Sequence, residues 1–387
     1  MIDVLYLIGT LGIGGTERHL SIVLPELVRR GWRIEVALLA EDGPFGEPLR
    51  NSGVTITRLG TGPVMRIPKL SGLLHLHSMV QTLSKRLLAD PPKLLHCFLP
   101  TSCIVGGWAA RAASFAPVAM SRRSQAIRPA LFPGDKLLER SALRRADLVF
   151  GHSRAVLSEL ERDGVASEHL RLVHNGIALA PPLTAAERKS TRAEEGWRDD
   201  EVIVIAVANL IQYKGHSDLL HGLAGAAANG LSGWRLVLVG DGSAQYLAAL
   251  RALVKELEIS DRVSFLGRRM DISRVLAGAD IGVLASHHEG FSNAVLEYMS
   301  AGLPVVVTAT GGNLDAVEDG TTGILVPVAA PDAIGRALSQ LILDTGSRNR
   351  MGTAGRLKVA REFSLDACVT QYEGAYLSLS VTHDRAA

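Results

Sequence analysis

The stretch Ile281–Val307 reads IGVLASHHEGFSNAVLEYMSAGLPVVV and contains a complete strand–loop–helix–strand unit. The apolar run Ile281–Leu284 predicts a buried strand, a helix is expected to start around Phe291–Asn293, and Val305–Val307 predicts a second strand. Two strands joined through a helix in this order run parallel in one sheet. The stretch therefore predicts an α/β fold with a parallel sheet.

The same alternation of strands and helices extends along the chain in both directions and falls into two series. The strand-like runs are short and rich in β-branched residues, which is typical of strands whose two faces are both covered by helices. The first series is expected at Val4–Ile8, Arg33–Leu39, Val54–Arg58, Lys93–His96, Pro117–Met120, Leu148–Gly151 and Leu170–His174. The second series is expected at Val202–Ala208, Arg235–Val239, Val263–Leu266, Ile281–Leu284, Val305–Val307 and Gly323–Val326. We therefore expect two Rossmann-like, doubly wound parallel-sheet domains.

The length of the chain also favours two domains. Its 387 residues exceed what one hydrophobic core usually organises. The segment Ala178–Asp200 contains Pro181 and Pro182 followed by a polar run, which is typical of an exposed linker that leads into a helix. We expect an N-terminal domain at residues 1–177 and a C-terminal domain at residues 178–364.

The composition excludes several classes of protein. Hydrophobic residues make up 47% and charged residues 21%, as in an ordinary globular protein. Cys97, Cys103 and Cys368 form no CxxC pair, so we expect neither a disulfide framework nor a zinc site, and a reducing cytoplasm fits. The apolar start Val4–Ile8 lacks a basic flank and predicts a buried strand rather than a signal peptide. No stretch reaches the roughly 18 apolar residues of a membrane span.

Charge is distributed unevenly between the two halves. Residues 1–180 contain 22 lysines and arginines against 15 acidic residues, whereas the whole chain has a net charge of only +2. Aromatic residues are few and no nucleic-acid reader motif is present, so we do not expect nucleic acid as a partner. The basic half would suit an anionic lipid-linked acceptor or the inner face of the cytoplasmic membrane, with an ordinary solvated surface as the alternative. The basic residues in question are Lys85, Arg86, Arg122, Arg123, Lys136, Arg140, Arg144 and Arg145.

Loops that follow parallel strands are where doubly wound sheets bind ligands. The first of them, Gly9–Glu17, reads GTLGIGGTE, and its glycines would let backbone amides approach a phosphate or a sugar closely. Its spacing does not match the GxGxxG dinucleotide fingerprint. A plain tight turn is the alternative interpretation.

Two loops of the second series carry similar signals. Lys214 and Gly215 follow the strand Val202–Ala208, and a lysine there could stabilise a departing diphosphate. A merely solvated lysine is the alternative. Gly240 stands in a second glycine-bearing loop, directly after the strand Arg235–Val239.

The strongest local signal is a pair of glutamates in the stretch quoted first. Glu289 lies in the loop after the strand Ile281–Leu284, and Glu297 lies eight residues on, two turns into the expected helix. One carboxylate could then meet a transferred sugar while the other accepts hydrogen bonds from ribose hydroxyls. Amides at the helix start, Phe291–Asn293, suit a diphosphate. The alternative is that both glutamates are capping or exposed charges.

This block resembles the two-glutamate signature of glycosyltransferase family 4, a large group of retaining transferases with the GT-B fold. The resemblance covers nearly the whole chain and includes the motifs GGTER at Gly14–Arg18, ADLVFGHS at Ala146–Ser153, VHNGI at Val173–Ile177, KG at Lys214–Gly215 and the glycine-bearing stretch Gly311–Val326. It implies two domains facing a cleft, with acceptor binding by the first and nucleotide-sugar binding by the second. It also implies that the last helix, in residues 365–387, returns to the N-terminal domain.

The resemblance implies a role for each matching residue. Glu289 would contact the donor sugar and Lys214 the diphosphate, as the two catalytic residues, while Glu297 would bind the ribose. The further donor-binding residues would be Gly14, Gly15, Asn209, Gly240, Gly290, Phe291, Ser292 and Asn293. No Asp-x-Asp metal motif is apparent, so we expect a metal-independent enzyme without a cofactor.

Two positions depart from the family pattern. Many members have an arginine where this chain has Asn209, which carries no charge. A histidine that often follows the fifth strand of the first domain is replaced by the stretch that contains Arg122 and Arg123. Either arginine could contact the acceptor instead, and a solvated pair is the alternative. His96 is a second candidate for acceptor binding, with a buried core histidine as the alternative.

The expected function is that of a retaining hexosyltransferase. It would move a sugar from a nucleoside-diphosphate sugar, a UDP-sugar first and GDP-mannose next, to a glycan or lipid-linked acceptor in surface polysaccharide biosynthesis. The same architecture also serves sugar-nucleotide epimerases and phosphorylases, and an epimerase would convert the donor without an acceptor. A non-catalytic nucleotide-sugar binding protein is the alternative from another class.

Overall fold

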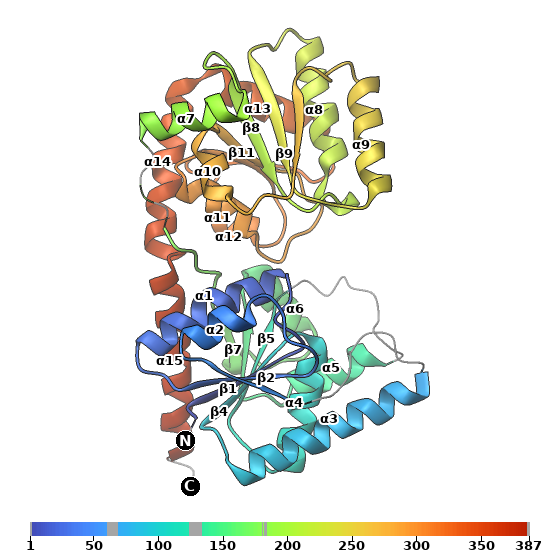
Figure 1. Ribbon diagram of the computed structural model, residues 1–387, viewed down its shortest axis with the longest axis vertical. Helices are drawn as coiled ribbons and strands as arrows, with labels where there is room; N and C mark the ends of the chain where they lie inside the picture. The colour runs from blue at the N-terminus through green and yellow to red at the C-terminus, as the bar shows by residue number, and fades with distance from the viewer. Residues whose placement is uncertain (1, 60–68, 124–133, 180, 182–183, 385–387) are drawn as a thin grey trace. The chain divides into compact units, whose positions relative to one another are not determined.

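The computed structural model describes residues 2–59, 69–123, 134–179, 181 and 184–384. The chain folds into two compact units (Figure 1). Unit 1 comprises Met1–Gly176 and Leu365–Ala387, and unit 2 comprises Ile177–Ser364. No helix in the described residues is both long enough and apolar enough to cross a membrane.

Unit 1 is built on a seven-stranded parallel sheet with the strand order β3-β2-β1-β4-β5-β6-β7. The order reverses between β1 and β4, as in a doubly wound fold. The strands are β1 (Val4–Ile8), β2 (Ile34–Leu38), β3 (Thr55–Arg58), β4 (Leu94–Phe98), β5 (Val118–Arg122), β6 (Leu148–Gly151) and β7 (Leu170–Leu172). All strands expected in the first series are confirmed, with ends that differ by no more than two residues.

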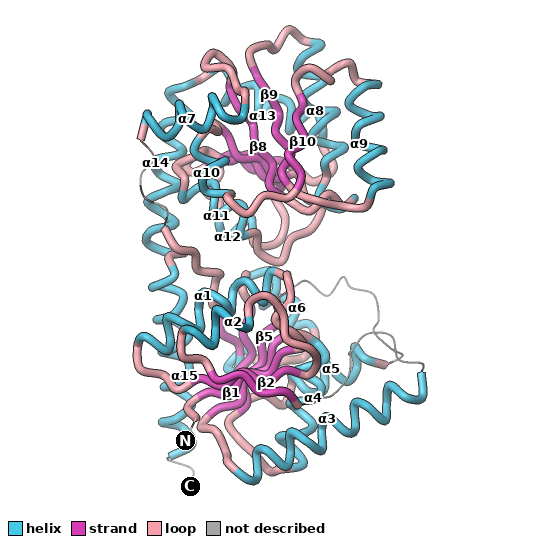
Figure 2. The backbone as a smooth tube through the Cα atoms, viewed as in Figure 1, coloured by secondary structure: helices cyan, strands magenta, loops and turns pink. Residues whose placement is uncertain are grey.

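Helices cover both faces of this sheet (Figure 2). Apolar side chains of α1 (Gly15–Arg29), α2 (Gly46–Asn51) and α15 (Leu365–Asp384) pack on one face. Those of α3 (Lys69–Ala89), α4 (Pro100–Ala112), α5 (Asp135–Leu143) and α6 (Arg154–Arg162) pack on the other. In α1 the buried residues Leu20, Val23, Leu24 and Leu27 recur at helical spacing and form one apolar stripe.

The last helix, α15, belongs to unit 1 although it follows unit 2 in the sequence. The hydroxyl of Tyr376 lies 2.8 Å from the hydroxyl of Tyr6 and 2.8 Å from Nδ1 of His96. At the rim, Arg30, which directly follows α1, pairs with Glu373 at 2.5 Å. Because buried polar atoms are costly without partners, this chain of hydrogen bonds fixes the helix at one position on the sheet.

Unit 2 is built on a six-stranded parallel sheet with the order β10-β9-β8-β11-β12-β13. The strands are β8 (Val202–Val207), β9 (Trp234–Val239), β10 (Val263–Gly267), β11 (Ile281–Leu284), β12 (Val305–Thr308) and β13 (Gly323–Val326). The second expected series is therefore confirmed as well. The two sheets together confirm the predicted pair of Rossmann-like domains.

The helices of unit 2 also lie on both faces of their sheet. One face is covered by α8 (His216–Ala228), α9 (Ala244–Glu256) and α13 (Pro331–Leu343). The other is covered by α10 (Ile272–Ala277), α11 (Asn293–Ser300) and the end of α14 (Thr345–Glu362). Short α12 (Asn313–Ala316) follows β12, and α7 (Ala185–Glu195) precedes β8.

Helix α7 begins where the sequence predicts a linker that leads into a helix. Thr184 and Glu187 form a capping box: Glu187 N donates to Thr184 Oγ1 at 3.1 Å, and Thr184 N donates to Glu187 Oε2 at 2.8 Å. Such reciprocal bonds satisfy two amides at the helix start and define where the helix begins.

Candidate active site

The predicted donor-binding residues of unit 2 lie in loops at one edge of its sheet. The loop after β8 carries Asn209 and Lys214, the loop after β9 carries Gly240, and the loop after β11 carries Glu289. Because the strands are parallel, their carboxyl ends lie at the same edge. We call this region the carboxyl edge of unit 2.

The structure brings Lys214 and Glu289 into direct contact at this edge. Nζ of Lys214 lies 2.5 Å from Oε1 of Glu289. The two side chains are only 16% and 9% exposed, and Ser286 Oγ donates a second hydrogen bond to the same oxygen at 2.6 Å. A cation and a carboxylate, both largely removed from water, therefore meet at the place where the sequence predicts the reacting sugar and the diphosphate.

Gly215 explains why Lys214 reaches this position. Lys214 ends a short 3₁₀ turn, η2 (Gln212–Lys214), and Gly215 takes a left-handed conformation with φ 69° before α8 begins. A Cβ atom on Gly215 would collide with the carbonyl oxygen of Ala285, just beyond β11. Only glycine lets the backbone of this loop approach the end of β11 so closely. Packing thus requires glycine after Lys214, and this close packing places the lysine beside Glu289.

The loops that carry the two charges are also fastened to each other. His287 N donates to the carbonyl oxygen of Tyr213 at 2.7 Å, and His287 Nε2 lies 2.7 Å from Asp218 Oδ2. The ring of Tyr213 stacks on His288, with centroids 4.6 Å apart. These contacts involve residues within four positions of Lys214 or Glu289 in sequence, so they hold both charged side chains in place before any ligand binds.

Sequence reasoning missed these fastening residues. The two histidines that precede Glu289 in the first quoted stretch were the available signal, because they stand within the motif. Asp218 offered none, since an acidic residue in the first turn of a helix is ordinary.

The start of α11 lies where the sequence predicts it. Ser292 is the N-cap and α11 begins at Asn293. Glu297 is therefore the fifth residue of the helix, about one turn from its start, and the expected two turns were wrong because residues 290–292 are still loop. Its neighbour Tyr298 is fully buried, and its hydroxyl accepts a hydrogen bond from Val207 N at 2.5 Å. This bond fixes α11, and with it the backbone of Glu297, against the end of β8.

Phe291 contributes its side chain to the core. It is 8% exposed, and its ring lies 5.7 Å from that of Phe363. Gly312 N donates to the carbonyl oxygen of Gly290 at 3.0 Å, which fixes the backbone just before Phe291. The side chain of Phe291 thus serves packing, and the contact of its backbone with a ligand stays a prediction.

Asn209 and Gly240 lie on neighbouring loops of the same edge. Asn209 is exposed, and its uncharged side chain remains the departure from the family pattern. A Cβ atom on Gly240 would collide with the carbonyl oxygen of Ala208. The close approach of these loops is by itself a sufficient reason for glycine at position 240.

His216, the first residue of α8, supplies no charge to this edge near neutral pH. It is 2% exposed, and burial, together with the nearby charge of Lys214, lowers its pKa to about 4. Its imidazole is therefore neutral, and Lys214 carries the positive charge of this loop.

In unit 1, Gly14 and Gly15 lie at the start of α1, after the loop that follows β1. Gly14 is the N-cap, and a Cβ atom there would collide with the carboxylate of Glu17. A Cβ atom on Gly15 would meet no described atom within 4 Å. Packing does not require glycine at position 15, so the open space beside this helix N-terminus is compatible with a small anionic group.

Two of the three acceptor candidates, His96 and Arg122, are buried in the structure. His96 is fully buried, with Nδ1 2.8 Å from the hydroxyl of Tyr376 and Nε2 2.8 Å from Oγ of Ser121. It is a core histidine whose ring nitrogens are both used. Arg122 is also buried, 2.7 Å from Asp163 and 3.7 Å from Glu139, so it points into the unit. For His96 this agrees with the alternative of a buried core histidine, whereas Arg122 is not the solvated side chain that its alternative describes.

Arg123, the third candidate, is partly exposed and follows β5 directly. Its Nη2 donates to Oδ1 of Asn175 at 2.5 Å. Another feature at this end of unit 1 is Leu99, which follows β4 with φ 73°, an uncommon conformation for a branched residue. Such backbone strain often occurs at functional sites, and nothing in the sequence Leu99-Pro100 signals it.

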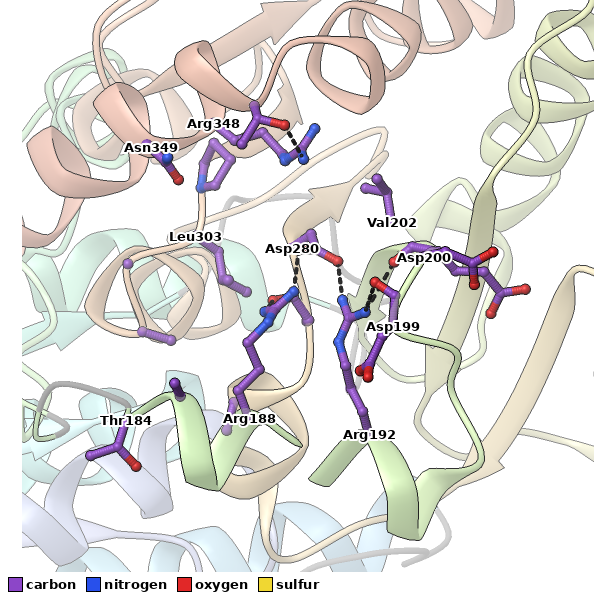
Figure 3. Close-up of a pocket in the computed structure, with 18 residues that line it drawn as sticks. Thr184, Arg188, Arg192, Asp199, Asp200, Val202, Asp280, Leu303, Arg348 and Asn349 are labelled. Carbon is purple, nitrogen blue, oxygen red and sulfur yellow. Dashed lines mark hydrogen bonds and ion pairs between the residues drawn. The ribbon is translucent and has the colours of Figure 1, made fainter. Parts of the chain in front are cut away.

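A hollow of about 580 Å³ lies at the opposite edge of unit 2, near the amino ends of β8, β11 and β12 (Figure 3). Arg188 and Arg192 of α7 point toward Asp280 there, and each pairs with it at 2.5 Å. Arg192 also donates to the carbonyl oxygens of Gly278 and Arg198. Arg188, Arg192 and Asp280 thus bind one another and fasten α7 to the sheet, and none of the predicted site residues lines the hollow.

Two family models match the chain. The model described as Glycosyltransferase Family 4 matches residues 13–180, and the model described as Glycosyl transferases group 1 matches residues 187–358. The first match lies almost entirely in unit 1 and the second in unit 2.

Curated relatives carry related descriptions. An N-acetyl-alpha-D-glucosaminyl L-malate synthase of Bacillus anthracis is 29% identical over 239 residues, which are 62% of this chain and 61% of the relative. A lipopolysaccharide core biosynthesis glycosyltransferase of Rhizobium meliloti is 31% identical over 47% of this chain and 51% of the relative. A D-inositol 3-phosphate glycosyltransferase of Mycobacteroides abscessus is 27% identical over 88% of this chain and 79% of the relative. The matches span between about half and four fifths of these relatives' own lengths.

Solved structures share the architecture. The crystal structure of Anabaena HepE in complex with UDP and glucose matches with a TM-score of 0.81 and 23% identity, over 98% of this chain and all of that one. At this level of identity the similarity shows the fold.

Proposed function

The chain belongs to glycosyltransferase family 4 and has the GT-B fold, and from this premise we propose that it is a retaining, metal-independent hexosyltransferase. Unit 2 would bind a nucleoside-diphosphate sugar and unit 1 the acceptor. The observation that carries the proposal is the contact between Lys214 and Glu289, held in place by Gly215 and by the bonds of His287.

The chemistry of sugar transfer explains why such a pair is useful. As the bond from the anomeric carbon to the diphosphate breaks, negative charge grows on the diphosphate and positive charge on the sugar. A fixed ammonium group and helix amides stabilise the negative charge on the diphosphate, and a fixed carboxylate stabilises the positive charge on the sugar. In the retaining reaction the acceptor hydroxyl attacks from the face that the diphosphate leaves, and the leaving phosphate takes the hydroxyl proton.

We propose a UDP-sugar as the first donor to test and GDP-mannose as the second. The complex of Anabaena HepE with UDP and glucose supports this order, because it has the same fold. Asn209 would hydrogen-bond a diphosphate without contributing charge, so Lys214 and the amides of Gly290–Asn293 would carry most of the phosphate binding.

For the acceptor we propose a glycan or lipid-linked molecule of surface polysaccharide biosynthesis. The relative described as a lipopolysaccharide core transferase supports this class. L-malate and D-inositol 3-phosphate, which appear in the names of two other relatives, are both anions and fit the basic first half of the chain. The enzyme would then work in the cytoplasm, at the inner face of the membrane.

The test combines binding with product analysis. UDP and GDP should each be screened for thermal stabilisation, since a ligand that binds the folded state raises its stability by mass action. The matching nucleotide sugars should then be incubated with lipid extracts, and the anomeric configuration of the product followed by NMR. A product with the donor's configuration supports the proposal. Conversion of the donor without an acceptor would identify an epimerase, and binding without turnover on any acceptor would identify a non-catalytic protein.

A further inference from the structure

Two adjacent arginines at the end of β5 have different surroundings. Arg122 is buried, and the carboxylates of Asp163 and Glu139 balance its charge. Arg123 has no carboxylate partner among the described residues, and its hydrogen bond goes to the neutral amide of Asn175. The charge of Arg123 is therefore not balanced within the described part of unit 1.

The groups around Arg123 cannot supply the missing negative charge. Its positive charge acts on His19, His96 and His152, three buried histidines. Burial in the first place, and Arg123 in addition, holds the pKa of each imidazole well below its usual range, so all three are neutral near pH 7. The Tyr372 hydroxyl, which also lies near Arg123, is buried, and burial raises its pKa.

An arginine without a nearby carboxylate favours the binding of an anionic ligand. Its guanidinium stays protonated, and a charge that is partly withdrawn from water is costly without a counter-charge. The hydrogen bond to Asn175 uses one N–H of five, and the Tyr372 hydroxyl lies close enough to Arg123 to take up another. The remaining N–H groups form a planar fork that fits two oxygens of a phosphate or a carboxylate.

Arg123 lies at the edge of the sheet where doubly wound folds generally bind ligands. Arg123 follows β5, His152 follows β6 and Asn175 follows β7, so all three lie at the carboxyl edge of the unit 1 sheet. His19 lies in α1, which begins at Gly15, and its buried Nδ1 has no hydrogen-bond partner among the described residues. A second polar atom in this region is thus left unsatisfied.

We propose that Arg123 binds a phosphate or carboxylate group of the acceptor at the carboxyl edge of unit 1. The inference rests on the proposed function, because it names the chemical class of the acceptor in the same reaction. The guanidinium of Arg123 sets this chain's preference for a charged acceptor, because it can pair with an anionic group. An acceptor with a phosphate or a carboxylate next to its reactive hydroxyl would be anchored there, whereas a neutral sugar would not.

The test uses small anions as probes. Methyl phosphate and succinate, with neutral inositol as the control, should be titrated calorimetrically into the protein saturated with UDP, which fills the diphosphate position of unit 2. We expect the wild type to bind at least one anion and not inositol. Arg123→Gln should weaken that binding by about tenfold or more, because it removes a charge-assisted pair of hydrogen bonds. Arg111→Gln, at an exposed arginine of α4 in the same unit, should leave binding unchanged.

The outcomes separate this inference from the proposed function. Equal anion binding by wild type and Arg123→Gln, with UDP binding intact, overturns the inference and leaves the transferase proposal standing. No anion binding by the wild type overturns it too. If UDP does not bind, the proposed function fails, and the same titrations in a Lys214→Ala background still decide whether Arg123 binds the anion.

Two further measurements cover the case in which Arg123→Gln does not fold. Arg123→Lys keeps the charge and loses the planar fork, so we expect intermediate anion affinity. In the wild type, a bound anion should slow amide hydrogen exchange in residues 118–123 and 173–176. Anion binding without protection in either segment would place the anion elsewhere and contradict the inference.

Discussion

At the scale of single residues, the role of the Lys214 charge can be tested against that of another lysine in the same unit. Lys214 contacts Glu289 directly and is largely buried, whereas Lys189 of α7 is an exposed lysine of the same unit. We do not expect an exposed lysine outside the site to contribute to ligand binding or turnover. The two positions therefore separate the loss of a specific charge from the loss of any charge.

We expect Lys214→Ala to lower kcat/KM by about 100-fold or more, because it removes a contact that strengthens as the diphosphate departs. Lys189→Ala should leave kcat/KM within about twofold of the wild type. Steady-state kinetics with the nucleotide sugar measures both. Wild-type activity in Lys214→Ala would mean that the lysine does not bind the leaving group.

At the scale of elements, the junction between η2, α8 and the end of β11 determines where the catalytic charges lie. Gly215 permits this junction in two ways. Its backbone adopts a left-handed conformation, and its lack of a side chain lets the loop contact the carbonyl oxygen of Ala285. Gly225, further along α8, offers a matched control because a Cβ atom there would meet no described atom within 4 Å.

We expect Gly215→Ala to lower the free energy of unfolding by about 1–3 kcal/mol, since it strains the backbone and forces two loops apart. It should also reduce kcat, because Lys214 moves away from Glu289. Gly225→Ala should raise the free energy of unfolding by roughly 0.5–1 kcal/mol, as alanine favours a helix interior over glycine. Urea unfolding measures both variants. A Gly215→Ala protein as stable and active as Gly225→Ala would show that the close approach is unimportant.

At the scale of the whole molecule, buried neutral histidines occur in both units and should make the fold sensitive to acid. His216 in unit 2 has a pKa lowered to about 4, and the pKa values of His19, His96 and His152 in unit 1 are lowered well below the usual range. Between the unfolded pKa, near 6.5, and the lower folded pKa, the unfolded chain binds more protons. The free energy of unfolding therefore falls as pH decreases through this window.

We expect the free energy of unfolding to decline from pH 7 to pH 5, with a slope of up to about 1.4 kcal/mol per pH unit for each such histidine. His216→Gln should reduce the slope, whereas His221→Gln, at an exposed histidine of the same helix, should not. Urea unfolding across this pH range gives the slope. A free energy of unfolding that does not change between pH 7 and pH 5 would contradict the burial of these neutral rings.

Most of the fold could be predicted from the sequence because short apolar runs between helix-like stretches mark the strands of parallel sheets. The strand ends were less certain, since backbone hydrogen bonds decide them: the strand expected at Leu170–His174 ends at Leu172. The meeting of Lys214 with Glu289 followed from the rule that parallel strands end at one edge.

Other parts of the site could not be predicted. Arg122 and Arg123 are identical neighbours, yet one is neutralised by Asp163, about forty positions later, and the other is not. Successive side chains of a strand point in opposite directions, and only the folded chain shows which direction meets a carboxylate. The contact between His287 and Asp218 likewise joins two loops that are far apart in the sequence.

The central claim is that Glu289 acts on the reacting sugar while Glu297 binds the ribose. The most direct measurement compares Glu289→Gln and Glu297→Gln in two assays: turnover of the nucleotide sugar, and calorimetric binding of the nucleoside diphosphate, which lacks the sugar. We predict that Glu289→Gln lowers kcat by about 10²–10³ with binding largely kept, because the carboxylate acts chiefly in the transition state. Glu297→Gln should instead weaken nucleoside-diphosphate binding and raise the donor KM. Equal weakening of binding by both variants, without a selective loss of turnover in Glu289→Gln, would contradict the account.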